Sequence, residues 1–202
     1  MSKFLGDHKD KVPRAIQAHA ANLASASRFW PVLALIELAL RTTLNTQLEI
    51  RNCKRGVRIH WGLDPQNEIR KKNVKSSRDL DQAREILRRT RRSVTPGGII
   101  DELPLGFWTM LVSKRFKEFW PDLVEGFKGL KSRDSKEVDE LLQFFKAFRN
   151  QIGHHHVIIF MDLKVVNQKL MRLAYLIDPR LEEILKVLAG FEWRGPSQTI
   201  QE

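Results

Sequence analysis

An arginine, an amide and a histidine lie close together near the end of a predicted helix. They are Arg149, Asn150 and His154, and two more histidines, His155 and His156, follow at once. Three of the six histidines of the chain are therefore in this segment. Arginine can hold a phosphate through two parallel hydrogen bonds, and imidazole can transfer a proton near neutral pH. Together these groups can cleave a phosphodiester without a metal ion.

Arg149 and His154 can act on the same phosphate only if the helix breaks between them. Residues five positions apart do not share a face of an uninterrupted helix. Gly153 can provide the break, because glycine just past a helix end readily takes the left-handed conformation that terminates a helix. We therefore expect the helix to end near Ile152, so that His154 folds back toward Arg149. The alternative is a helix terminus at which arginine and histidine merely offset the helix dipole.

Two apolar helices are expected to position this segment. The motif helix follows a polar turn at residues 132–136, and its apolar stripe should fix the direction of Arg149; the stripe contains Val138, Leu141, Leu142, Phe145, Phe148 and Ile152. A longer apolar helix is predicted over residues 28–52. Glu37 and Arg41 share a face of that helix. If this ion pair is shielded from water, it should have a further partner; otherwise it is an ordinary surface pair.

The remaining pattern is helical throughout. Further helices are predicted over residues 10–26, 79–92, 107–120, 161–177 and 180–189, and no series of strands is recognisable. The aromatic residues of 107–120 are interpreted as packing. His60 and Trp61 either stack on a base or close the core, and the core is the commoner role. The sequence predicts an all-α fold with one domain over residues 1–192 and a disordered tail over 193–202.

The composition indicates a polyanionic partner. The chain carries a formal net charge of +11, with a pI near 10.0. This favours RNA or DNA over an anionic membrane surface, although a protein can simply be basic. The candidate RNA-binding residues lie between positions 51 and 92: Arg51, Lys54, Arg55, Arg58, Lys71, Lys72, Arg88, Arg89, Arg91 and Arg92.

Cysteine usage and hydropathy suggest a reducing compartment. The lone Cys53 excludes an internal disulfide, and we interpret it as structural rather than as a nucleophile. The charged residues 1–14 do not resemble a secretory signal. The longest apolar run, residues 31–40, is interrupted by Glu37 and is too short to span a bilayer. We expect a cytoplasmic protein that does not bind membranes.

Three ordered blocks resemble the Abi-like (phage abortive infection) proteins of the HEPN superfamily, over roughly residues 10 to 190. The blocks are Leu35–Arg41 with its Glu-x3-Arg pattern, Glu102–Trp108 followed by Phe119-Trp120-Pro121, and Phe148–His155 with an Arg-Asn-x3-His motif. Family members often continue the histidine pair with Glu-Pro, whereas this chain has His156-Val157. The resemblance implies a HEPN-like helical bundle with additional helices. It also implies a toxin or antiviral-defence role and a homodimer in which two motifs face one cleft.

The predicted function is metal-independent endoribonuclease activity. RNA supplies its own 2′-hydroxyl as the nucleophile, so the protein needs only proton transfer and charge stabilisation. His154 would transfer protons, Arg149 would bind the phosphate, and Asn150 would orient either group. The second proton carrier would be His155, His156 or the His154 of a partner copy. By resemblance, Glu37 and Arg41 are auxiliary residues that support the motif helix.

No cofactor and no metal are expected, because adjacent histidines on one backbone rarely converge on one ion. A zinc or iron site at the three histidines is the alternative. A toxic nuclease would also need an inhibitor, so an antitoxin protein or an inhibitory RNA is a candidate partner. Two other functions remain open: a non-catalytic RNA-binding HEPN module, or a helical interaction protein in a defence or toxin–antitoxin system.

Overall fold

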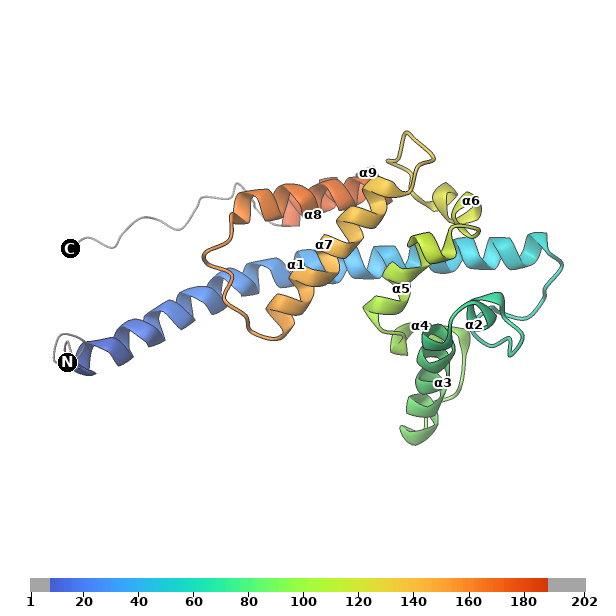
Figure 1. Cartoon of the computed structure of the whole chain (residues 1–202), viewed down its shortest axis with the longest axis horizontal. Helices are drawn as coiled ribbons and strands as arrows, with labels where there is room; N and C mark the ends of the chain where they lie inside the picture. The colour runs from blue at the N-terminus through green and yellow to red at the C-terminus, as the bar shows by residue number, and fades with distance from the viewer. Residues whose placement is uncertain (1–7, 189–202) are drawn as a thin grey trace.

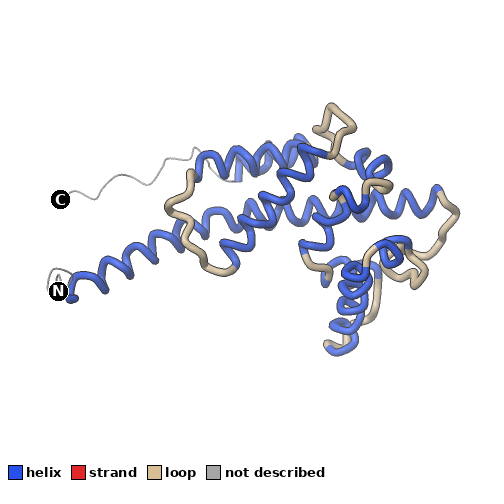
Figure 2. Tube along the Cα trace, viewed as in Figure 1, coloured by secondary structure: helices blue, strands red, loops and turns tan. Residues whose placement is uncertain are grey.

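A computed structural model describes the backbone of residues 8–188 and the side chains of residues 13–187. The predicted tail over 193–202 lies outside the described residues. Within them the all-α prediction is confirmed, since every element is helical (Figure 2). The elements are α1 (His8–Lys54), α2 (Glu68–Lys72), α3 (Val74–Arg89), α4 (Pro96–Glu102), α5 (Leu105–Leu111), η1 (Lys114–Phe116), α6 (Trp120–Leu123), η2 (Val124–Gly126), α7 (Lys136–Gly153), α8 (Leu163–Ile177) and α9 (Pro179–Leu188).

The 47-residue helix α1 is the central element of the molecule. Figure 1 shows it running through the structure, with α8 and α9 above it and α2, α3 and α4 below. Its buried stripe recurs at helical spacing and consists of Phe29, Val32, Leu33, Ile36, Leu40, Leu44 and Leu48. These side chains form the core with α5, α6, α7 and α8. The helix is therefore central because its apolar surface is wide enough to contact several partners.

The helices predicted over residues 10–26 and 28–52 are one continuous helix. Pro31 lies inside α1, where proline removes a backbone donor and bends a helix without always ending it. Figure 1 shows α1 changing direction along its length. The break predicted between residues 26 and 28 was wrong: these residues are helical, and Ala26 and Phe29 on either side of it are buried in the core.

By length and apolar composition, α1 from Pro13 to Lys54 also meets the criteria for a membrane-crossing helix. A core helix of a soluble protein meets the same criteria, and 33% of the most apolar window is buried within the structure. The cytoplasmic location therefore stays a prediction.

Aromatic packing joins the middle of the chain to the loop after α1. Trp61 stacks on Phe107 at 5.8 Å between ring centroids, and Trp108 meets both rings edge-on. The indole nitrogen of Trp61 donates to Asn45 Oδ1 at 2.8 Å. The core interpretation of Trp61 and of the aromatic block is confirmed. The block is not one helix as predicted, because it divides into α5, η1 and α6.

His60 lies at the edge of the core, and both of its ring nitrogens contact neighbouring groups. Nδ1 accepts from the backbone N–H of Gly62 at 3.0 Å, and Nε2 lies 3.0 Å from a Glu49 carboxylate oxygen. Burial lowers the pKa of His60 below its ordinary value. With both nitrogens engaged, His60 has a structural role and no free nitrogen for base catalysis.

The loop after η2 approaches the end of α8 very closely. The Gly129 N–H donates to the Leu176 carbonyl at 3.1 Å. A Cβ atom at Gly129 would lie only 2.0 Å from the Tyr175 carbonyl oxygen. Backbone lies against backbone here, so only glycine fits.

Gly129→Ala should lower the free energy of unfolding by about 3 kcal/mol, because the clash can be relieved only by moving the α8 backbone. The matched control is Gly97→Ala, where a Cβ would meet nothing within 4 Å. Urea denaturation followed by circular dichroism measures both variants. Equal stability of the two would contradict the packing described for Gly129.

Candidate functional site

The motif helix α7 ends one residue later than the end predicted near Ile152. Gly153 is its last residue, and His155 has the left-handed backbone conformation, with φ at 56°. The His155 N–H donates to the Ile152 carbonyl at 3.1 Å, and the His156 N–H donates to the Gln151 carbonyl at 2.8 Å. These two bonds satisfy the carbonyls that a helix terminus leaves free. The predicted helix end near Ile152 is therefore correct to within one residue, but the residue with the left-handed conformation is His155 and not Gly153.

The side chain of Arg149 lies alongside Gly153 at the end of α7. A Cβ atom at Gly153 would lie 3.6 Å from Nη1 of Arg149. The two residues are four positions apart and share a face of α7. The guanidinium therefore extends along the helix to its last turn, beside the residue that precedes His154. Arg149 reaches toward the histidine segment, rather than the chain folding back to Arg149.

Glu37 of α1 holds this arginine. Its Oε2 lies 3.6 Å from Nε of Arg149, and its Oε1 pairs with Arg41. Arg41 also donates to the carbonyls of Ile100 and Asp101 at 3.0 and 3.1 Å. The predicted further partner of the Glu37–Arg41 pair is thus confirmed as Arg149. One carboxylate shared by two guanidiniums leaves a local excess of positive charge.

The guanidinium of Arg149 keeps capacity for an anion. Its side chain is 38% exposed, and its Nε is buried without a hydrogen-bond partner among the described residues. Glu37, at 15% side-chain exposure, is more enclosed. The acid is therefore fixed on the protein side, while part of the arginine faces solvent.

The three histidines are all exposed, and two of their rings are close. The ring centroids of His154 and His156 are 6.0 Å apart, with 37° between the ring planes. Among the described residues no hydrogen bond or ion pair joins Arg149 to His154. The side chain of Asn150 is exposed, and its carbonyl accepts the His154 N–H at 2.9 Å. The structure thus pairs His154 with His156 rather than with His155.

A buried amide that was not among the predicted site residues fixes the segment after the histidines. Asn22 of α1 is 2% exposed. Its Nδ2 donates to the His156 carbonyl at 3.1 Å, and its Oδ1 accepts from the N–H groups of Ile158 and Ile159 at 2.7 and 3.3 Å. These contacts span more than 130 residues of chain. A lone asparagine within an alanine-rich helix was the only signal for this role.

The basic residues between 51 and 92 divide into paired and unpaired groups. Arg51 is buried at 7% exposure, pairs with Asp122 and Glu68, and lies over the Phe119 ring. We therefore leave Arg51 out of any RNA-binding surface. Five others have acidic partners: Lys54, Arg55, Lys72, Arg89 and Arg92. Of the basic residues between 51 and 92, those that are exposed and lack an acidic partner among residues 13–187 are Arg58, Lys71, Arg78, Arg88 and Arg91.

Arg92 connects the basic segment to the arginine pair on Glu37. It bonds Glu102 at 2.5 Å and lies 3.8 Å from Asp101, whose carbonyl accepts from Arg41. Figure 1 shows the C-terminal end of α7 on the same side of α1 as α3 and α4. In this view the end of α7 that carries the motif and the helix α3 are therefore on one side of the central helix.

Cys53 is exposed near the end of α1, and is not part of the core. Over the described part of the chain, no group of three or more histidine, cysteine or acidic side chains is placed to hold a metal ion. Comparisons with protein-family models, curated proteins and solved structures gave no match. The function is therefore argued from these residues, their geometry and the resemblance of the three sequence blocks.

Asn22→Ala should lower the free energy of unfolding by about 2 kcal/mol, because it leaves two buried N–H groups without an acceptor. It should also speed hydrogen exchange at the amides of Ile158 and Ile159. Asn52→Ala is the control, since Asn52 makes one exposed hydrogen bond, to the Ile59 carbonyl. Unchanged protection of the two isoleucine amides would show that Asn22 does not hold this segment.

Proposed function

We propose that the protein is a metal-independent endoribonuclease of the Abi-like HEPN type, acting in toxin or phage-defence biology. The observation that carries the proposal is the arginine that Glu37 holds and whose guanidinium lies beside Gly153, the residue before His154, whose ring is 6.0 Å from that of His156. The resemblance of the Glu37–Arg41, Gly106-Phe107-Trp108 and Arg149–His154 blocks supports the same family.

In the proposed reaction the RNA 2′-oxygen attacks the adjacent phosphorus. A bond forms between O2′ and phosphorus, and the bond from phosphorus to the 5′-oxygen of the next nucleotide breaks. His154 takes the 2′-hydroxyl proton or delivers a proton to the leaving oxygen, and His156 performs the other role. The products carry a 2′,3′-cyclic phosphate and a 5′-hydroxyl.

Arg149 binds the phosphate and stabilises the charge that grows on its oxygens. Glu37 keeps the guanidinium in place without neutralising it, because Arg41 shares the same carboxylate. Asn150 is exposed on the same turn and orients the phosphate. The 6.0 Å between the His154 and His156 ring centroids is short enough for both rings to contact one phosphodiester group.

The proposed substrate is RNA, and the proposed assembly is a cytoplasmic homodimer. The net charge of +11 and the unpaired cations of α2 and α3 favour a polyanion.

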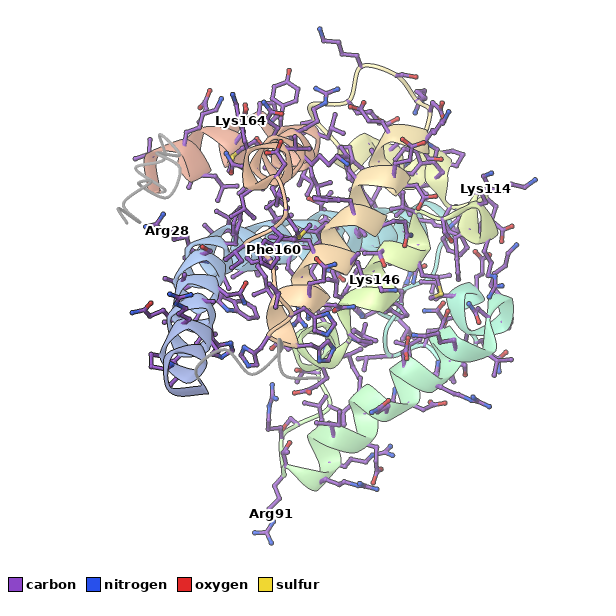
Figure 3. The ribbon with its side chains drawn as sticks, turned by 60° about the vertical axis from the view of Figure 1, so that its left-hand side comes forward. Arg28, Arg91, Lys114, Lys146, Phe160 and Lys164 are labelled. Atoms are coloured by element: carbon purple, nitrogen blue, oxygen red, sulfur yellow. The ribbon has the colours of Figure 1, made fainter. Side chains whose placement is uncertain are left out.

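Val157 and Phe160, close to the histidines, are 59% and 89% exposed. Figure 3 shows Phe160 on the loop between α7 and α8. Exposed apolar side chains at the edge of the site favour a protein partner, either a second copy or an antitoxin.

A non-catalytic RNA-binding module is the second candidate. It is favoured by His156-Val157 in place of Glu-Pro and by the lack of direct contact between Arg149 and His154 among the described residues. The exposed apolar residues also suit an interaction protein. Product analysis separates these functions, because only the nuclease forms cyclic-phosphate ends.

His154→Ala and Arg149→Ala should each slow RNA cleavage by about 10²- to 10⁴-fold, because each removes a proton-transfer or charge-stabilising group. The assay follows cleavage of total cellular RNA with end-group analysis. Arg28→Ala is the matched control for the loss of charge, since Arg28 is exposed on α1 and has no contact with the motif among the described residues. Full cleavage by either motif variant, with the fold intact, would overturn the assignment.

An oligonucleotide with a single deoxyribose at the cleaved position should resist cleavage, because its 2′-oxygen nucleophile is missing. The control is the same oligonucleotide with the deoxyribose two positions away, which should be cleaved normally. Equal cleavage of both substrates would exclude attack by the 2′-hydroxyl.

A further inference from the structure

Two lysine ammonium groups from distant parts of the chain converge over Gly106. A Cβ atom at Gly106 would lie 3.6 Å from Nζ of Lys146 on α7 and 4.0 Å from Nζ of Lys75 on α3. The two nitrogens are therefore within about 8 Å of each other. An N–H···O bond between an ammonium and a phosphate oxygen is about 2.8 Å long, so both groups can reach oxygens of one phosphate.

The charge at this point is not balanced by the protein. Lys75 lies 3.1 Å from Asp79, its neighbour one turn along α3. Lys146 has no acidic partner among residues 13–187. Two cations held close together with one acid repel each other unless an anion lies between them. The glycine, which has no side chain, keeps the space between them open.

One of the two lysines, Lys146, lies on the same face of α7 as the arginine of the motif. Lys146 and Arg149 are three positions apart on α7, and Gly153 is seven positions after Lys146, so all three share one face. Figure 3 shows Lys146 midway along α7. A polyanion bound at Arg149 and continuing along α7 would therefore reach Lys146 next.

We propose that Lys146 and Lys75 form a phosphate-binding subsite, above Gly106, for a nucleotide that flanks the cleaved bond of RNA. The inference rests on the proposed endoribonuclease function. It places the bound strand along α7, from Arg149 to Lys146. The lysines bind and position the strand, and they do not take part in the chemical step.

Gly106→Asp tests the subsite by placing a carboxylate between the two ammonium groups. The contacts of 3.6 Å or more leave room for the new Cβ. The variant should raise Tm by about 2 °C, because the carboxylate satisfies the lysines. It should also weaken RNA binding about tenfold, because the carboxylate occupies the position of the phosphate.

Gly97→Asp is the matched control for this substitution. Gly97 is also the second residue of a short helix, and a Cβ there would meet nothing within 4 Å. It adds the same charge without contacting the lysines. Equal effects of the two substitutions on both Tm and RNA affinity would overturn the proposal.

A second pair of variants tests the lysines directly. Lys75→Ala/Lys146→Ala should weaken binding of a non-cleavable 2′-O-methyl RNA about fivefold or more. It should also reduce the slope of log Kd against log salt by about 0.7, the value for one phosphate contact on a single strand. Lys114→Ala/Lys164→Ala removes the same charge from exposed lysines that lie far from Lys146 (Figure 3) and should leave the slope unchanged. Lys146→Arg should retain binding.

Binding and cleavage together separate the two proposals. If the native chain binds and cleaves RNA, and the Lys75/Lys146 variant behaves as the control variant does, the subsite is refuted alone. If the native chain binds RNA through these lysines but forms no cyclic phosphate, the nuclease function is refuted and the subsite stands. If the native chain does not bind RNA, both are refuted.

Discussion

A single carboxylate on the central helix fixes the arrangement of the site. Glu37 lies among apolar residues of α1 and its side chain is only 15% exposed, so its charge is costly unless partners compensate for the lost water. Two guanidiniums supply that compensation, one from the next turn of α1 and one from α7. Arg41 is in turn held by two carbonyls of α4. The buried apolar stripe of α7 fixes the rotation of this helix, and the ion pair with Glu37 then fixes the direction of the Arg149 side chain.

Nearby acidic side chains also decide which basic residues of the chain remain free to bind an anion. Arg51, prominent in the sequence as the first of a basic run, is buried between Asp122 and Glu68 and stabilises the contact of α1 with α2 and α6. Most other cations near it also have acidic partners. Between residues 51 and 92 the exposed positive charge without an acidic partner lies at Arg58, Lys71, Arg78, Arg88 and Arg91, and on α7 Lys146 also has no acidic partner among residues 13–187. A count of basic residues thus overstates the binding surface, because pairing is decided by tertiary contacts.

What could be predicted from the sequence is what depends on local periodicity. The amphipathic helix α8 and the end of α7 were each predicted to within two residues. The helix α3 was also predicted, but it begins at Val74 and not at residue 79. The partner of Glu37 was anticipated from the apolar character of its helix. The left-handed conformation of His155 was not, because it is favoured only by the two bonds that follow it. The Asn22 contact was not either, since it joins segments more than 130 residues apart.

The openness of the site bears on how it could act. Electrostatic stabilisation of a transition state is strongest where water is excluded and the groups are already aligned. Here the three histidines are exposed, and Arg149 approaches their turn without touching His154. A partner or a bound strand that covers the histidine turn must therefore bring Arg149 and the imidazoles into alignment. The exposed Val157 and Phe160 beside it offer an apolar edge for a second protein surface, while the bound strand itself would draw the guanidinium and imidazoles onto one phosphate. A site of this kind would be weakly active alone, and its activity would depend on assembly.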